Sequence, residues 1–242
     1  VIFAVEVLAA GEMRYEALLP AFTASFSASA VASLLGIHKE NLTIHISESL
    51  TPFLLVRLIT LGIIFGITGG LFAWCLKRTK KYLGEKIKNP LVRVFSIGVV
   101  LSILFLVLYR GRYCGFGTNL VEAVFTGEKV YAYDWALKFI LTVLTLSAGF
   151  QGGEVTPLFT IGATLGAVLG SLFGIPVELS AALGYAAVFG GGTNTLLAAI
   201  FIGGEIFGYD YLPYFFIVCT AAYVFNRNSS IYSRQKLTKY SC

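Results

Sequence analysis

Six apolar stretches, separated by polar or glycine-rich segments, dominate the pattern of hydrophobic and polar positions along this chain. An upright helix needs about 20 residues to cross the hydrocarbon core of a bilayer, so some of these stretches are long enough and others are too short. Uneven lengths with glycine interruptions indicate broken or re-entrant helices, which occur at membrane depth only inside protein or beside a wet cavity. The pattern therefore predicts an all-α polytopic membrane protein with tilted, broken and re-entrant helices. The stretches cover residues 51–76, 90–109, 135–146, 158–173, 179–189 and 211–225.

The composition excludes an ordinary soluble domain. Hydrophobic residues make up 57% of the chain, charged residues only 13%, and the mean hydropathy is +0.79, whereas about a quarter of the residues of a soluble domain are charged. The net charge of +5 is local, because a basic cluster falls between two long apolar stretches. By the positive-inside rule this predicted loop is cytoplasmic, so its charge indicates topology and contact with membrane lipid, not nucleic acid. The cluster consists of Lys77, Arg78, Lys80, Lys81, Lys86, Lys88 and Arg93.

The position of this loop predicts the sides on which the other polar segments lie. Residues 36–51 would be external, and both histidines, His38 and His45, fall there. They are either pH-sensing groups or solvated loop residues. The basic tail, which contains Arg234, Lys236 and Lys239, would be cytoplasmic.

Several other features have a structural interpretation. The small residues of segment 21–36 predict a helix-packing or subunit surface. A short helix is expected over residues 118–125, with Thr118 or Asn119 as its cap and Gly127 at its end. The cysteines lack the spacing of a metal site or a disulfide framework and are interpreted as small core residues or free thiols. They are Cys75, Cys114, Cys219 and Cys242.

The stretch GFQGGEVTP places a carboxylate, Glu154, inside an apolar and glycine-rich run. It reads as a flexible loop that leads into a helix, with Pro157 in the first turn, where its missing amide costs little. Free backbone amides and the positive end of the helix dipole make such a start an anion site. Glu154 is therefore either a transport acid that competes with a bound anion or a glutamate that only caps the helix. Gly162, Gly166 and Gly170 follow on one helical face.

A second discontinuity follows at FGGGTNTLLAAIFIGGEIFG, residues 189–208. Thr193, Asn194 and Thr195 are candidate caps for a helix that ends near Gly208. Two helix starts that point into the bilayer are typical of midplane anion sites in transporters. Glu205 lies inside this apolar helix, either as a hydrogen-bonding partner for a neighbouring helix or as a functional acid.

These motifs, in this order, resemble the C-terminal half of the CLC chloride channel and transporter family. The resemblance covers about residues 1–240 and rests on VIFAVEV, the GGxxxP loop, the IxxxE helix and a late tyrosine. It implies a CLC-type fold and the C-terminal part of an inverted-repeat architecture. Residues 1–242 are accordingly interpreted as a partial transmembrane domain without its N-terminal half and without a soluble regulatory domain.

Within that family, GGEVTP and NSSIYSRQ resemble the fluoride-exporting branch, whose members are proton-coupled antiporters. The resemblance assigns Gly153, Glu154, Val155, Thr156 and Tyr232 to anion binding and selectivity, and Glu154 also to proton coupling. Val155 replaces the phenylalanine that is familiar in chloride-handling members. Fluoride is strongly hydrated, so strong donors such as the two hydroxyls and backbone amides would have to replace its water.

The proton path departs from that of the chloride/proton exchangers. Their internal acid directly follows the glutamate that matches Glu6, and this position is Val7 here. The family's external gating glutamate lies in the N-terminal half, which this sequence does not include. We therefore expect Glu154 to carry part of the proton-coupling role.

The sequence thus predicts fluoride/proton antiport, with fluoride, protons and lipid as partners and no cofactor. The resemblance also implies a homodimer in a bacterial plasma membrane, with a cytoplasmic C-terminus. Two alternatives remain open. One is a chloride channel or chloride/proton exchanger of the same family, and the other is an intramembrane hydrolase. The hydrolase would have to use Asp134 and Asp210, and the sequence contains no GxGD, HExxH or GxSxG motif.

Overall fold

The computed structural model describes residues 1–10, 15–37, 42, 44, 50–226, 228–233 and 235–237. Helices dominate this part of the chain, and its strands β1 and β2 are two residues each and pair in parallel. The elements in chain order are α1 Ile2–Glu6, β1 Ala9–Ala10, η1 Tyr15–Ala17, α2 Leu18–Leu34, α3 Pro52–Lys86, α4 Pro90–Val107, η2 Tyr109–Gly111, α5 Thr118–Phe125, α6 Asp134–Ala148, α7 Val155–Phe173, α8 Val177–Thr193, α9 Leu197–Phe207, η3 Tyr209–Tyr211, α10 Leu212–Phe225 and β2 Lys236–Leu237.

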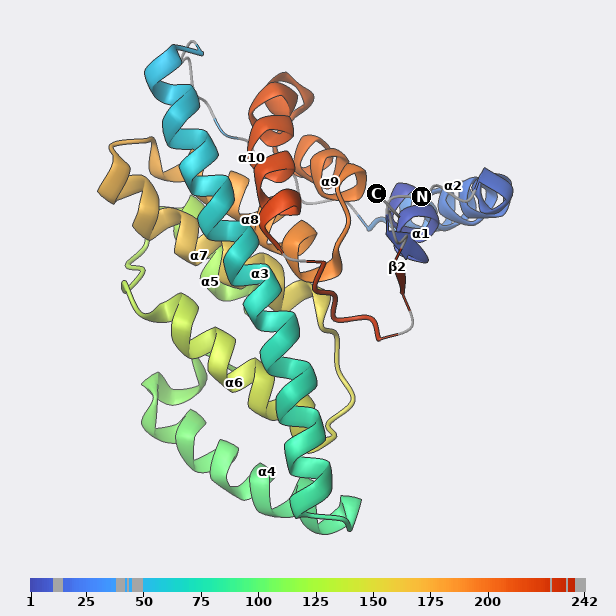
Figure 1. Ribbon diagram of the computed structural model, residues 1–242, viewed down its shortest axis with the longest axis vertical. Helices are drawn as coiled ribbons and strands as arrows, with labels where there is room; N and C mark the ends of the chain where they lie inside the picture. The colour runs from blue at the N-terminus through green and yellow to red at the C-terminus, as the bar shows by residue number, and fades with distance from the viewer. Residues whose placement is uncertain are drawn as a thin grey trace, which may run out of the picture.

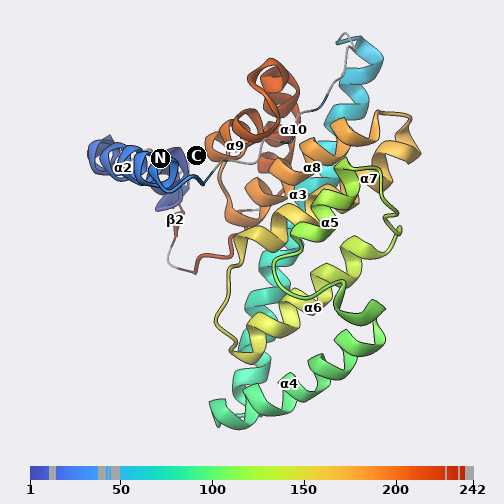
Figure 2. The same ribbon diagram turned by 180° about the vertical axis from the view of Figure 1, so that it is seen from behind.

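The long helix α3 runs the length of the molecule, and α6, α7, α8 and α10 pack along it (Figure 1). Seen from behind, α5 lies across α7, and α4 lies at the end of the molecule where α3 finishes (Figure 2). Fully buried aromatic and aliphatic side chains fill the space between these helices, among them Phe65, Phe72, Leu158, Leu183 and Phe189. The fold is therefore a helical bundle around α3, and its helical character confirms the all-α prediction from the apolar stretches.

Four helices in the described residues are long and apolar enough to cross a membrane. The others are shorter, as their stretches predict. This mixture of full-length and broken helices confirms the polytopic architecture. The four are Tyr15–Leu34, Pro52–Lys86, Pro90–Val107 and Val155–Phe173.

The basic cluster differs from the sequence prediction. It was expected in a loop, but α3 stays helical to Lys86 and the connection to α4 is only residues 87–89. Asn89 caps the next helix, because its side-chain oxygen accepts from the amide of Leu91 at 3.0 Å and Pro90 begins α4. Most of the cluster therefore lies on a rigid helix end, which positions its side chains more firmly than a loop would.

The predicted glycine stripe of α7 forms its contact with α8. A Cβ atom at Gly162 would lie 2.1 Å from the carbonyl oxygen of Gly184, and one at Gly166 would lie 2.3 Å from that of Ser180. The two backbones touch with no side chain between them, which is the close approach that small residues permit. This contact holds the axis of α7, and thus its first turn, against the core.

Two predicted helix caps were wrong. The residue that caps α5 is Gly117, with φ of +87°, and the Asn119 side chain instead donates to the carbonyl of Arg112 at 2.9 Å. The triple glycine belongs to the last turns of α8, so Thr193 ends that helix and Asn194 follows in the left-handed region. Asparagine tolerates that conformation, which explains why α8 stops there.

Other predictions concern the surface and the thiols. Helix α2 buries none of its residues, which suits a helix that packs outside this chain. Cys75, Cys114 and Cys219 are free thiols. The remaining cysteine, both histidines and two basic residues of the tail lie outside the described residues: Cys242, His38, His45, Arg234 and Lys239.

Candidate functional site

The start of α7 combines a glycine-rich loop with a charged side chain. Glu154 is the residue before the first turn and has helical backbone angles, but its side chain makes no hydrogen bond to the helix amides. Pro157 is buried in the first turn. No described residue accepts a hydrogen bond from the amides of Glu154 or Val155. These donors and the positive end of the helix dipole lie together at one point.

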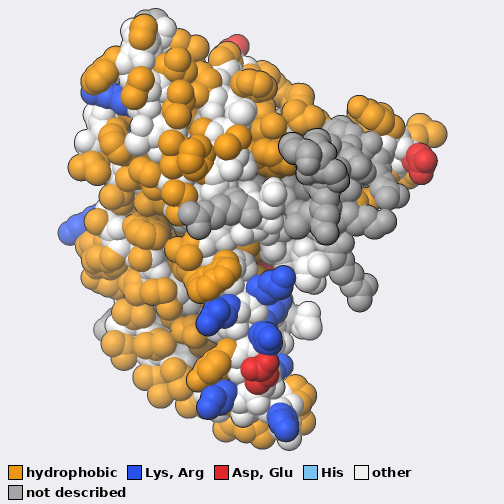
Figure 3. Space-filling model, in the orientation of Figure 1, with side chains coloured by type: hydrophobic (Ala, Val, Ile, Leu, Met, Phe, Trp, Pro, Cys, Tyr) orange, Lys and Arg blue, Asp and Glu red, His pale blue; other side chains and the backbone are white. Residues whose placement is uncertain are grey.

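The carboxylate of Glu154 pairs with Lys80, a member of the basic cluster that indicates topology in the sequence. Lys80 Nζ lies 3.1 Å from Glu154 Oε1, with 51% of the lysine side chain and 21% of the glutamate side chain exposed. Lysine and arginine side chains gather over the lower end of α3 (Figure 3). Since exposed ion pairs add little to stability, this one matters mainly for where it places the carboxylate.

The second helix start, that of α9, already carries a carboxylate. Glu6 is buried, and its two oxygens accept from the amides of Leu196, Leu197 and Ala198 at 2.7, 3.0 and 2.7 Å. A buried carboxylate with three amide donors is well satisfied, and the helix dipole favours its charge. The N-terminal turn of α9 is therefore occupied by the chain itself, so only the start of α7 keeps free donors among these two.

The C-terminal end of α8 anchors the segment that carries Tyr232. The carbonyl of Thr193 accepts from the side chains of Ser230 and Gln235, and the carbonyl of Gly192 accepts from the amide of Ile231 at 2.9 Å. Asn226 adds a buried bond of 2.7 Å to the Asn194 side chain. The triple-glycine segment therefore holds the tail in place.

The tail places Tyr232 close enough to Glu154 for the two groups to interact electrostatically. Its ring lies 6.3 Å from that of Phe3. Burial, and then the negative charge of Glu154, raise the pKa of the Tyr232 phenol above its ordinary value. The hydroxyl therefore stays protonated and available as a hydrogen-bond donor.

The remaining predicted residues lie on two different cavities. Gly153 lines a cavity of about 320 Å³ together with Lys138 and Pro157. Thr156 lines another of about 580 Å³ with Glu122 and Tyr185. Glu154 and Tyr232 thus interact electrostatically, whereas Gly153 and Thr156 line different cavities at the start of α7.

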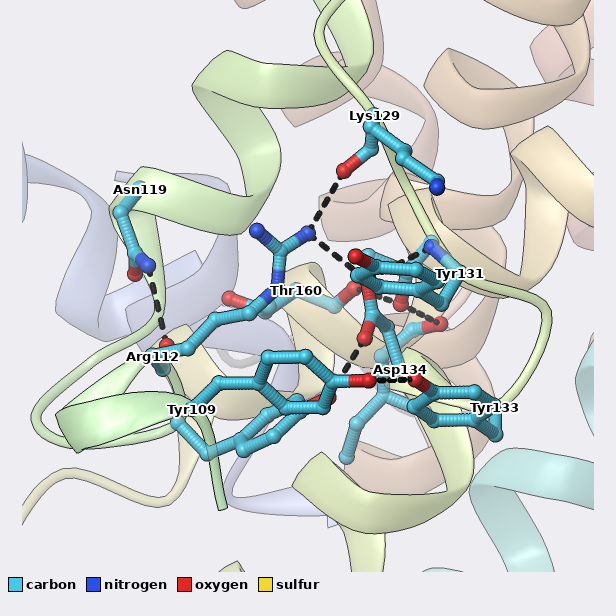
Figure 4. Close-up of polar contacts among 11 residues, drawn as sticks. Tyr109, Arg112, Asn119, Lys129, Tyr131, Tyr133, Asp134 and Thr160 are labelled. Carbon is cyan, nitrogen blue, oxygen red and sulfur yellow. Dashed lines mark hydrogen bonds and ion pairs between the residues drawn. The ribbon is translucent and has the colours of Figure 1, made fainter. Parts of the chain in front are cut away.

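A buried ion pair fixes the connection between α4 and α6 (Figure 4). Asp134 is fully buried and accepts from the Arg112 guanidinium at 2.9 Å, from the Tyr113 hydroxyl at 2.6 Å and from the Tyr131 amide at 2.9 Å. Arg112 also donates to the carbonyl of Lys129 at 2.8 Å. All these groups belong to the segments on either side of α5, so the network locks both to the start of α6.

Lys138 extends this support to the α7 start. Its side chain is 1% exposed and donates to the carbonyls of Tyr113 and Gly115 at 3.1 and 2.7 Å. Thr160 of α7 donates to the next carbonyl of that segment, Phe116, at 3.1 Å. The segment is therefore held between α6 and α7, and Phe116 lies beside Gly153.

In the comparison with protein families, residues 1–227 match the family described as voltage gated chloride channel. The chain belongs to this family. The resemblance inferred from the sequence motifs is thus confirmed, and so is the CLC-type fold.

Three relatives refine the position of the chain within the CLC family. A solved structure described as a CLC-type fluoride/proton antiporter is 51% identical and superposes with a TM-score of 0.95, over 98% of this chain and 60% of that one. The chloride/fluoride channel protein of Pseudomonas syringae pv. tomato is 34% identical over 98% of this chain and 53% of its own length. The voltage-gated ClC-type chloride channel ClcB of Salmonella dublin is 24% identical over 91% and 57%. The chain spans about half the length of the curated relatives it matches.

Membership of the family excludes the hydrolase alternative, since these relatives are channels and antiporters. The positions of the two aspartates that a hydrolase would need are consistent with this exclusion. Asp134 is engaged in its buried ion pair, and Asp210 is exposed on η3. Within the described residues, no three His, Cys, Asp or Glu side chains come close enough to hold a metal ion. Glu205 lies on the exposed side of α9, and its role stays a prediction.

Sequence reasoning missed the partners of both glutamates. Lys80 is 74 residues from Glu154, and the amides that bind Glu6 are 190 to 192 residues from it. The sequence offers one signal for such a pairing: a glutamate and a helix start that both lie in apolar segments. Several glutamates and helix starts meet this description, so the signal does not identify which of them pair.

Proposed function

We propose that this chain forms part of a fluoride/proton antiporter that moves fluoride outward as protons move inward. The observation that carries the proposal is the start of α7, where Lys80 holds the Glu154 carboxylate and the amides of Glu154 and Val155 have no acceptor among the described residues. The solved neighbour that is 51% identical over 98% of the chain is described as an antiporter of this kind, which supports the choice of ion.

In this proposal fluoride binds at the α7 N-terminus. Backbone amides and the hydroxyls of Thr156 and Tyr232 replace the water that the ion loses, and Gly153 allows close approach. A gating carboxylate from a segment outside this chain alternately fills and leaves the site. Glu154 shares a proton or a hydrogen bond with that group and so couples the two movements.

A chloride channel or chloride/proton exchanger is the second candidate. The description of the family and the ClcB relative favour it. Val155, in place of the familiar phenylalanine, favours fluoride. The relative rates for the two ions decide between these candidates.

The remaining proposals concern the assembly and the membrane. The exposed apolar helix α2 suits a homodimer in which each subunit has its own path. The basic end of α3 suits the cytoplasmic side of a bacterial inner membrane, with the C-terminus on the same side. We also propose that residues 1–242 are one part of a larger transmembrane domain.

Efflux from liposomes that contain the full-length protein tests the function, with fluoride and chloride electrodes read in parallel. We expect fluoride efflux well above chloride efflux, accompanied by proton uptake, and loss of coupling in Glu154→Gln. The control is Glu85→Gln, an exposed glutamate that pairs with Lys81 at the end of α3. Equal or faster chloride efflux that is unchanged in Glu154→Gln would refute the proposal.

A further inference from the structure

We propose that Lys80 is a positioning residue that holds the Glu154 carboxylate away from the N-terminus of α7 and so keeps the amides of that turn available to the anion. This inference rests on the proposed function. It assigns to the basic end of α3 a direct role in anion affinity, beyond its topological signal.

The geometry gives Glu154 two competing partners. Its backbone is helical, with φ of −88° and ψ of −23°, and it directly precedes the first turn of α7. The positive end of the helix dipole attracts a carboxylate at this position. Its oxygen instead lies 3.1 Å from Lys80 Nζ, and the side chain makes no capping bond.

Glu6 shows what a carboxylate does at a helix start in this molecule without a basic partner. No ion pair joins it to a described basic residue, and its two oxygens bind three amides at the start of α9. Glu6 reaches its helix start from another helix, whereas Glu154 directly precedes its own. The carboxylate that binds helix amides has no described basic partner, and the carboxylate that pairs with a lysine binds none of them.

No other described basic residue forms an ion pair with Glu154. Tyr232, on the tail, is a neutral phenol whose pKa is raised by burial and then by the charge of Glu154. Arg93 of α4 lies at the opposite end of the loop, where its guanidinium donates to the carbonyl of Ala148 at 3.0 Å. Without the Lys80 charge, the amides at the start of its own helix are favourable partners for the carboxylate, and there it would compete with the anion.

The test is the fluoride dependence of the initial efflux rate from liposomes that contain full-length protein. We expect Lys80→Met to raise the half-saturating fluoride concentration about tenfold and to leave the maximal rate nearly unchanged. The size follows because the interaction of a carboxylate with a helix start corresponds to a change in affinity of up to about tenfold. Lys80→Arg keeps the charge and should restore affinity. Lys81→Met is the matched control, because Lys81 is an adjacent exposed lysine that pairs with Glu85 and not with Glu154.

The double variant Lys80→Met, Glu154→Gln separates positioning from a general loss of charge. If Lys80 acts through Glu154, the double variant has the same half-saturating concentration as Glu154→Gln alone. An unchanged concentration in Lys80→Met, or a further rise in the double variant over Glu154→Gln, would overturn the inference.

The same experiment distinguishes this inference from the proposed function. A wild-type protein that exports chloride and not fluoride refutes the proposed ion, and the Lys80 series is then measured with chloride. A wild-type protein that exports fluoride with Lys80→Met unchanged refutes the positioning role alone. A wild-type protein that transports neither ion refutes both.

Discussion

Glu6 and Ala198 are 192 residues apart, and the carboxylate of the first accepts a hydrogen bond of 2.7 Å from the amide of the second. The same carboxylate binds the amides of Leu196 and Leu197. It thereby joins the first helix of the chain to the start of α9 and satisfies three amides that would otherwise lack partners.

Replacement of Glu6 by glutamine removes the charge and one acceptor oxygen and leaves the shape unchanged. We expect the free energy of unfolding to fall by about 1–3 kcal/mol, because a buried amide of α9 loses its acceptor. Thermal unfolding of the detergent-solubilised protein measures the change. Glu16→Gln, on the exposed side of η1, is the control and should leave the midpoint unchanged. Equal midpoints for the two variants would contradict the capping role.

Gly166→Ala tests the contact between α7 and α8. The added methyl would lie 2.3 Å from the backbone carbonyl oxygen of Ser180, which cannot rotate away. Overpacking of this kind costs about 1–3 kcal/mol, so we expect a lower unfolding midpoint and partial loss of monodisperse protein in size-exclusion chromatography. Gly84→Ala, at a half-buried position in the last turns of α3, meets only the end of the Arg93 side chain at 3.4 Å and should be neutral or slightly stabilising. If both variants lost stability equally, the close contact would not be the cause.

Asp134→Asn tests the network of Figure 4. The change leaves the Arg112 guanidinium without its carboxylate in a buried setting. Breaking a buried pair costs about 3–5 kcal/mol, and the partial exposure of Arg112 places the expected loss near the lower end. Asp210→Asn, on the surface of η3, is the matched control. A double-mutant cycle with Arg112→Met should show a coupling energy between the two residues, and additive effects would contradict the ion pair.

Tyr113 makes the free energy of unfolding depend on pH in the alkaline range. Burial, and then its hydrogen bond to Asp134, raise the pKa of its phenol above the ordinary value of 10.0. In the unfolded chain the phenol loses its proton near pH 10, whereas in the folded chain it keeps it, so unfolding becomes more favourable as pH rises above 10. We expect Tyr113→Phe to be less stable than the wild type at pH 8. Above pH 10 its free energy of unfolding should fall less steeply than that of the wild type, by about 1.4 kcal/mol per pH unit. Parallel pH profiles for the two proteins would contradict this.

Local pattern and contact distance explain which parts of the molecule were predictable. The residues of α5, the α7 start and its glycine stripe follow from signals a few residues apart, and the structure has them where the sequence indicates. The caps of α5 and α9 were not predictable in this way, because a glycine with φ of +87° and a glutamate 190 residues away replaced the local side chains. The position of the Glu154 carboxylate likewise depends on Lys80, whose pairing no local pattern encodes.

The backbone contact between α7 and α8 has a mechanical consequence. Carbonyl groups of α8 press directly on Gly162 and Gly166, so no deformable layer of side chains separates the two helices. Any sliding or tilting of α7 alone would drive backbone into backbone, and the pair therefore moves as one rigid body. The backbone at the start of α7 is therefore held in place, and the side chains of Glu154 and Lys80 are the parts of this site that can change by rotation about their own bonds.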